Sequence, residues 1–409
     1  MLYIYYVPDD VNVQHSKLTL KVQKKTIFDL RLIKELKDQE FSFLTVNKRC
    51  VMNGTLISEE VVDDLASKKQ PFCCFKNISV SSPDPLPGYK IIVLWTKILG
   101  RHDPRLFLGT KLFQNCDVKT CQTTFNKVEI IKSDAVIFHV YHLCDLNDMP
   151  QYRFGSQRWV AFMTEAPPHD KLRHGKSNFS IFNNIFNWSM TYRLDSHIPI
   201  PFGATFKRER VLSLNALTQD TIPTKTRLVA WFVSHCHTPA KRESFVEELQ
   251  HYIKVDIVGR CGKIKCPYLG NECYAWLEKH YKFYLALENS VCKDYVTEKF
   301  FNVLDYNVVP IVLGGANYSD IAPPNSYIDA RKFQSVEELA KFLLLVDKYD
   351  DLYNSYFEWK KTHRVERYGA GGHGWCELCA ALHDRKLPAN TIKDFHGWWY
   401  KESRCENLD

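Results

Sequence analysis

The stretch YKFYLALENSVCKDYVTEKFFNVLDYNVVPIVLGG, residues 281–315, gives the clearest indication of the fold class. It opens with an apolar run typical of a buried strand, and residues 294–306 then place apolar side chains at helical spacing. Residues 307–315 predict a second strand, although Pro310 weakens that prediction because proline cannot donate to a sheet ladder. Strand, helix and strand in this order predict two parallel strands with a right-handed crossover.

Polar side chains gather where this first strand ends and the helix begins. Glu288 and Asn289 follow the strand directly, while Tyr295, Glu298 and Lys299 are spaced i, i+3, i+4 and are predicted to share one helical face. Ligands of open α/β sheets bind at the carboxyl ends of the strands, so the cluster is a candidate ligand site. On spacing alone, an ordinary exposed face of Glu and Lys is the commoner explanation.

A second strand–helix–strand pattern lies upstream. Residues 227–234 and 254–259 are apolar runs that predict strands, and Thr238 and Pro239 suit the Ncap and N1 positions of the helix between them. Arg242 comes early in that helix. Helix N-termini attract phosphate, and an arginine fork can bind it through two hydrogen bonds. The two helix starts therefore predict a site for a diphosphate with an attached ribose.

Residues 89–193 show the same α/β character. Four apolar runs predict strands of a parallel sheet, at residues 89–95, 134–143, 158–164 and 186–193. Glu165 follows the third run, and Pro167 and Pro168 stiffen the loop that also carries His169. A partly desolvated carboxylate there is expected to have a raised pKa and to accept a proton from a hydroxyl. A solvated loop carboxylate is the more frequent alternative.

Length and charge limit the classes of protein that fit. The chain has 409 residues, more than one hydrophobic core usually supports, which favours two domains. The net charge of +7 comes without a long basic stripe, so nucleic-acid binding is not expected. No run of about 18 apolar residues is present, so no membrane-spanning helix is predicted. The sequence also lacks dinucleotide, P-loop and Asp-x-Asp motifs.

The 14 cysteines and five Asn-x-Ser/Thr sequons favour an oxidising secretory compartment. The sequons are candidate N-glycosylation sites at Asn53, Asn77, Asn178, Asn187 and Asn317. An alternative use of the cysteines is a zinc cluster, with candidate ligands Cys261, Cys266, Cys273, Cys376 and Cys379. Because their spacing is irregular, structural disulfides are the favoured expectation.

Several segments in order resemble the α1,3-fucosyltransferase family, and together they cover residues 89–385. Two of them resemble its donor-binding region: LALENSVCKDYVTEKFFN (285–302) and VVPIVLGGANYSDIAPPNSYIDARKF (308–333). Three others resemble further family segments: TEAPPH (164–169), FNWSMTYRLDSHIPIPFG (186–203) and WFVSHCHTPAKRESF (231–245). The chain departs from the family pattern at Ala166, where Ser is usual, and at His235, where Asn is usual.

The resemblance implies a GT-B fold, two Rossmann-like domains facing each other across a cleft. It implies inverting transfer of L-fucose from GDP-fucose to O3 of a GlcNAc, with no cofactor required and a divalent cation as an optional stimulant. Glu165 is then the general base, with His169 on the acceptor side. Arg242 and Lys299 hold the diphosphate. The remaining donor contacts implied are Ser234, Asn289, Tyr295 and Glu298.

The expected organisation has four parts: a stem-like region and linker at 1–88, an acceptor-side domain at 89–215, a GDP-fucose-binding domain at 216–385, and a tail at 386–409. The tail resembles the plant and invertebrate branch that fucosylates the innermost GlcNAc of N-glycans. Lewis-type α1,3/4 transfer to terminal lactosamine is the second expectation, and a non-catalytic luminal glycan-binding protein is the third. Cys376 and Cys379 are then expected to pair with each other or with Cys405. The family implies a Golgi lumenal enzyme whose membrane anchor is not in this chain.

Overall fold

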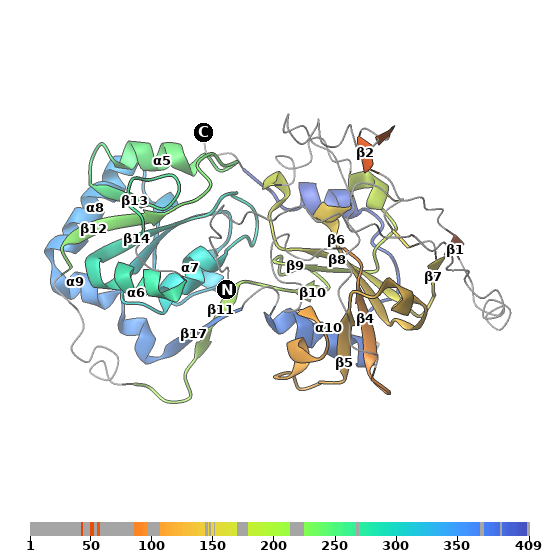
Figure 1. Cartoon of the computed structure of the whole chain (residues 1–409). Helices are drawn as coiled ribbons and strands as arrows, with labels where there is room; N and C mark the ends of the chain where they lie inside the picture. The colour runs from red at the N-terminus through yellow and green to blue at the C-terminus, as the bar shows by residue number, and fades with distance from the viewer. Residues whose placement is uncertain are drawn as a thin grey trace, which may run out of the picture.

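The computed structural model shows two α/β domains lying side by side (Figure 1). It describes residues 86–96, 107–143, 146, 149–150, 152–169, 179–212, 225–266, 270–368, 372–384 and 387–406, and the backbone of three short strands, β1 Ser42–Phe43, β2 Cys50–Met52 and β3 Thr55–Ile57. The α/β class and the two-domain GT-B organisation predicted from the sequence are confirmed. The described residues contain no helix long and apolar enough to cross a bilayer.

The first domain is built on six parallel strands in the order β10-β9-β8-β6-β4-β5. Their bounds are β4 Lys90–Leu94, β5 Cys121–Thr124, β6 Ala135–His139, β8 Arg158–Met163, β9 Trp188–Thr191 and β10 Ile198–Pro199. The four strands predicted here are all present, and they are almost wholly buried because a parallel sheet is covered on both faces. The described connections are short 3-10 helices: η2 Lys111–Phe113, η3 Lys127–Lys132, η4 Val140–His142 and η6 Phe179–Phe182.

The end of the chain covers both faces of this first sheet. Helix α10, Gly372–Asp384, packs on one face through the fully buried Trp375, and the π-helix Gly397–Lys401 packs on the other through the fully buried Trp399. Figure 1 shows these blue segments within the orange and olive domain. The predicted boundary at residue 385, with a separate tail after it, is therefore wrong, because residues 372–401 complete the core of the first domain.

Disulfides hold this returning segment in place. Cys376 pairs with Cys116 and Cys379 with Cys121, which joins α10 to the first sheet, and Cys405 pairs with Cys292 in the second domain. The expected pairing among Cys376, Cys379 and Cys405 is wrong, since each bonds a cysteine far away in the sequence. The remaining described pairs are Cys236–Cys261 and Cys266–Cys273. The zinc alternative is also wrong, because all five proposed ligands are oxidised.

The second domain has five parallel strands in the order β13-β12-β14-β15-β16. The strands are β12 Arg227–Phe232, β13 Val255–Val258, β14 Tyr281–Leu287, β15 Val309–Leu313 and β16 Ile328–Asp329. Helices α5 Arg242–Leu249, α8 Val336–Lys348 and α9 Asp350–Ser355 cover one face, and α6 Asn271–His280 and α7 Glu298–Leu304 cover the other. An antiparallel pair, β11 Gly203–Lys207 with β17 His363–Arg367, lies where the chain passes between the domains (Figure 1). Strand β7, Tyr152–Arg153, pairs with β1.

Pro310 lies inside β15, buried and opposite Tyr284 of β14. The strand prediction that it weakened is nonetheless confirmed. Strand β16 pairs with β15 only from Ile311 onward. At Pro310, the side of β15 that faces β16 therefore makes no inter-strand hydrogen bond that the missing N–H would remove.

The two disulfides on α10 close nearly the same loop, with sequence separations of 260 and 258 residues. Replacing Cys121 and Cys379 with Ala should lower the free energy of unfolding by only about 2 kcal/mol, because the second bond still closes the long loop. Replacing all four cysteines should cost about 5 kcal/mol, since the unfolded chain then regains the entropy of the whole loop. Denaturant titrations followed by tryptophan fluorescence measure both, and equal costs would contradict the shared-loop account.

Candidate functional site

Glu165 lies at the carboxyl end of β8, where the first domain contacts the second. Its Oε2 accepts hydrogen bonds from the Tyr295 hydroxyl at 3.0 Å and from the Asn289 side-chain amide at 3.5 Å. The hydroxyl of Tyr141 donates to the backbone oxygen of Glu165 at 2.9 Å and fixes the loop. Because Asn289 and Tyr295 follow β14, the carboxyl edges of the two sheets meet at this carboxylate.

A buried ion pair occupies the end of β14. The Glu288 side chain is fully buried, and Lys299 Nζ donates to its Oε2 at 3.1 Å and to Thr297 Oγ1 at 2.7 Å. Glu288 also accepts the backbone N–H of Thr297, the residue before α7, at 2.7 Å. Glu298 lies 3.4 Å from Lys299 Nζ. A buried charge is stable only when it is paired and hydrogen-bonded. Glu288 can therefore follow an apolar strand because it accepts from the N-terminal end of α7 and neutralises the charge of Lys299.

Tyr295 does not share a helical face with Glu298 and Lys299, and that prediction is wrong. Helix α7 begins at Glu298, after a segment in which Asp294 has a left-handed backbone with φ of 60°. The tyrosine instead lies in the loop before the helix, where its buried ring packs edge-on against Tyr192 at 4.8 Å between ring centres. This position lets its hydroxyl reach the first domain.

Arg242 is the first residue of α5 and is almost fully buried. Its Nη1 donates to the backbone oxygen of Leu287 at 2.6 Å and its Nη2 to that of His235 at 3.4 Å, and the guanidinium lies 5.5 Å from the centre of the Trp231 ring. These contacts tie one cation to the carboxyl ends of both β12 and β14.

Helix α5 starts later than predicted. Thr238 and Pro239 were expected at Ncap and N1, whereas the Ncap is Lys241, with φ of 47°. The backbone N–H and the hydroxyl of Thr238 donate to the Glu243 carboxylate at 2.8 and 3.0 Å, so Thr238 forms a turn ahead of the helix. That turn is held against β14, because the N–H of Ala240 donates to the backbone oxygen of Asn289 at 3.1 Å.

The pKa of Glu165 is below its ordinary value, opposite to the raised pKa expected from the sequence. Burial alone would raise this pKa. The charges of His169 and Lys299 and the hydrogen bonds from Tyr295 and Asn289 together lower the pKa by more than burial raises it. The direction of the pKa shift depends on which cations face the loop that carries Glu165, and the sequence does not show this. Glu165 is therefore ionised at neutral pH and able to accept a proton.

The cations of the site remain charged. Burial lowers the pKa of Lys299, but the carboxylates of Glu288 and Glu298 raise it above its ordinary value. Burial also lowers the pKa of Arg242, partly offset by Glu288. The pKa of Glu288 itself is raised, mainly by burial.

Three buried polar atoms near these cations have no hydrogen-bond partner among the described residues: Arg242 Nε, Asn289 Oδ1 and Ser290 Oγ. Buried polar groups are nearly always paired, so a cluster of unpaired ones at a sheet edge needs an explanation. A ligand bound at this edge would have to offer both acceptor and donor groups to pair them.

Two histidines meet where the domains touch, a contact that the sequence analysis did not predict. The ring of His169, after β8, lies edge-on to that of His235, after β12, with 6.3 Å between ring centres. Both residues lie in the loops that follow strands whose carboxyl ends face each other, His169 six residues after β8 and His235 three residues after β12, and this placement is the signal that points to them. Ser234 precedes His235 and is half-buried at the same edge.

The structure separates two of the candidate glycosylation sites. Asn187 is buried, and its side chain is bonded to Arg153, to the backbone N–H of Trp159 and to the backbone oxygen of Ala389, so that candidate is wrong. Asn317 is exposed. Asn53, Asn77 and Asn178 lie outside the described residues.

Two family models match the chain. Residues 222–398 match the C-terminal region of glycosyltransferase family 10 (fucosyltransferase), and residues 88–203 match the N-terminal region of the fucosyltransferases. These spans contain the residues that build the site around Glu165.

Curated relatives agree with these matches. The chain is 35% identical over 349 residues to alpha-(1,3)-fucosyltransferase C of Drosophila melanogaster, a match that covers 78% of this chain and 79% of the relative. It is 36% identical to glycoprotein 3-alpha-L-fucosyltransferase A of the same organism, over 71% of this chain and 56% of the relative. It is 38% identical to 3-galactosyl-N-acetylglucosaminide 4-alpha-L-fucosyltransferase FUT3 of Bos taurus, over 68% of this chain and 74% of the relative.

A solved structure described as alpha1,3-fucosyltransferase with GDP-fucose aligns with a TM-score of 0.48 and 17% identity, over 78% of this chain and 96% of that one.

Proposed function

This chain belongs to glycosyltransferase family 10 and is an α1,3-fucosyltransferase, and from this we propose that it moves L-fucose from GDP-fucose to the innermost GlcNAc of protein N-glycans, inverting the fucose anomeric carbon. One observation carries the proposed chemistry. The ionised Glu165 of one domain lies against the cation-bearing strand ends of the other, within hydrogen-bond distance of Tyr295 and Asn289.

The proposed donor site is the edge formed by β12 and β14. Arg242 and Lys299 supply positive charge for the diphosphate, and the buried Arg242 Nε has no hydrogen-bond partner among the described residues. Glu298 is placed to accept from ribose hydroxyls, with Ser234 at the same edge. Fixed cations in a site that excludes water stabilise developing charge far better than they do in solution.

In the proposed mechanism, a Glu165 oxygen takes the proton of the GlcNAc O3 hydroxyl as O3 attacks the fucose anomeric carbon. The bond from that carbon to the β-phosphate oxygen breaks, and the released charge lies on GDP, where Arg242 and Lys299 face it. A single displacement inverts the carbon. In this mechanism Arg242 and Lys299 stabilise the negative charge on the diphosphate, as a bound metal ion would. A divalent cation at the same place would stabilise that charge further.

Donor binding should make Glu165 a stronger base. Lys299 helps to lower the pKa of Glu165, and a diphosphate beside Lys299 would offset that effect. Because the base works only when deprotonated, activity falls as pH drops through its pKa. We expect the acid limb of kcat/KM for GDP-fucose, which reports the free enzyme, to lie below the pH range in which an ordinary glutamate titrates. The limb of kcat/KM for acceptor at saturating donor should lie higher. Identical limbs, or a free-enzyme limb near neutrality, would contradict this.

The acceptor is proposed to be the core GlcNAc because the tail sequence resembles the plant and invertebrate branch. The 36% identity to a glycoprotein 3-alpha-L-fucosyltransferase supports it. The second candidate is Lewis-type α1,3/4 transfer to terminal lactosamine, favoured by the 38% identity to the bovine 4-alpha-L-fucosyltransferase. Offering GDP-fucose with a core N-glycopeptide and a lactosamine together, followed by linkage analysis of the product, separates the two.

We place the enzyme in the lumen of the Golgi apparatus. The support is the oxidation state of its cysteines, since all ten cysteines whose side chains the structure describes are in disulfides and such bonds persist in oxidising compartments. Fucosylated products confined to Golgi fractions of expressing cells would agree with this placement, and products on cytosolic proteins would contradict it.

A further inference from the structure

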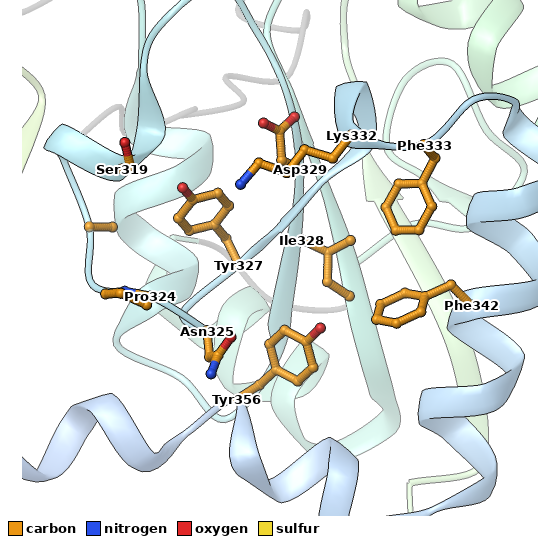
Figure 2. Close-up of a pocket in the computed structure, with 11 residues that line it drawn as sticks. Ser319, Pro324, Asn325, Tyr327, Ile328, Asp329, Lys332, Phe333, Phe342 and Tyr356 are labelled. Atoms are coloured by element: carbon orange, nitrogen blue, oxygen red, sulfur yellow. The ribbon is translucent and has the colours of Figure 1, made fainter.

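A cavity of about 350 Å³ lies in the second domain, against the edge strand β16 and helix α8 (Figure 2). None of its described lining residues belongs to the group that contacts Glu165. The volume is at the small end of the range for ligand pockets, about 300–1,000 Å³, and suits one or two sugar rings.

Four aromatic rings form much of the cavity wall: Tyr327, Phe333, Phe342 and Tyr356. All four are only half-buried, so each keeps part of its ring accessible. Phe333 and Phe342 support each other, with ring centres 5.3 Å apart, and Tyr327 is fixed against Phe300 at 5.9 Å. Figure 2 shows the Phe333 and Phe342 rings on the α8 side and the Tyr327 ring on the other side of β16. Rigid, partly exposed rings are suited to packing on the apolar face of a pyranose.

The polar groups at the cavity suit a neutral ligand with several hydroxyls. Asp329 and Lys332 contribute one negative and one positive charge, which gives no net field to select an ion. Asn325 contributes an amide and has a left-handed backbone with φ of 58°. The Tyr356 hydroxyl adds a further donor and acceptor.

We propose that this cavity binds one saccharide unit of an N-glycan, separately from transfer at Glu165. The unit has two sources in a secretory enzyme: a glycoprotein acceptor, or a glycan on this chain. The second is a structural option because Ser319 lines the cavity and is the third residue of the exposed Asn317 sequon. With either source, the ligand is a pyranose that stacks on the aromatic rings and is hydrogen-bonded by the Asp329 carboxylate and the Asn325 amide.

The test is saturation-transfer NMR with N,N′-diacetylchitobiose and methyl α-mannoside on the secreted chain, with GDP present. Tyr356→Ala and Asn325→Gly should each weaken the signal of at least one probe five-fold or more. Asn325→Gly relieves the left-handed backbone, so it removes the amide without threatening the fold. Matched controls are Tyr349→Ala and Leu345→Ala, exposed apolar residues outside the cavity, which should leave the signals unchanged. Wild-type signals in both cavity variants would overturn the proposal, whether or not the chain transfers fucose.

Two further arms identify the source of the saccharide. If an acceptor glycan fills the cavity, Tyr356→Ala should raise KM for a glycoprotein several-fold and leave KM for a small acceptor unchanged. If a glycan on Asn317 fills it, Asn317→Gln should strengthen the free chitobiose signal by emptying the cavity. No effect in either arm, together with probe signals insensitive to Asn325→Gly, would exclude a saccharide site.

Discussion

Replacing Glu165 with Gln is expected to lower kcat by about 100-fold to 10,000-fold, the range that a general base contributes. Gln keeps an oxygen that can accept from the Tyr295 hydroxyl, so the contact between the domains is retained while the proton acceptor is lost. GDP affinity should therefore stay at the wild-type value. Single-turnover transfer assays and calorimetry with GDP measure the two quantities.

Glu247→Gln is the matched control, because Glu247 is an exposed residue of α5 away from the domain contact. It should leave both quantities unchanged. A Glu165→Gln enzyme with kcat within a few-fold of wild type would show that another group takes the acceptor proton, and the assignment of the base would be wrong.

Replacing Lys299 with Ala should weaken two things at once. Donor affinity should fall by about 1.5–3 kcal/mol, the size of a hydrogen bond to a charged group. The fold should also lose about 3–5 kcal/mol, because the fully buried Glu288 would be left as an unpaired charge. Chemical denaturation and GDP calorimetry separate the two losses, and Lys341→Met, on the exposed face of α8, should change neither.

The double variant Glu288→Gln/Lys299→Met distinguishes the two roles of the lysine. Without the charge on residue 288 the unpaired buried anion is gone, so most of the lost folding stability should return. Donor affinity should remain low if Lys299 contacts the diphosphate. Recovery of GDP binding in the double variant would mean that the lysine only neutralises Glu288.

The fold was predictable where apolar runs are long enough to be seen. Strands β4, β6, β8 and β14 each carry five or more residues that are almost all buried. Strand β5 was not predictable, because its sequence CQTT looks polar although all four residues are buried. The assignment of α10 to the first domain was also out of reach, since it depends on contacts with residues more than 250 positions away.

The site was predictable in position and not in electrostatics. Parallel strands bring Glu165, Arg242 and Asn289 to facing edges, and topology alone implies that. The pairing of Lys299 with Glu288 and the lowered pKa of Glu165 depend on where the side chains point in the loops that follow the strands. These side-chain orientations cannot be predicted from the sequence.

The return of the chain to its first domain reverses the usual order of maturation on the ribosome. Most domains fold as they emerge, the earliest residues first. Here the sheet of residues 90–199 lacks part of the cover on both faces until Trp375 and Trp399 have been synthesised, whereas residues 225–368 form a contiguous unit that can close beforehand. We therefore expect the incomplete first domain to depend on chaperones until the end of the chain has been made. A stop codon before residue 399 would leave the acid-bearing half of the enzyme unassembled although every residue of that sheet had been made.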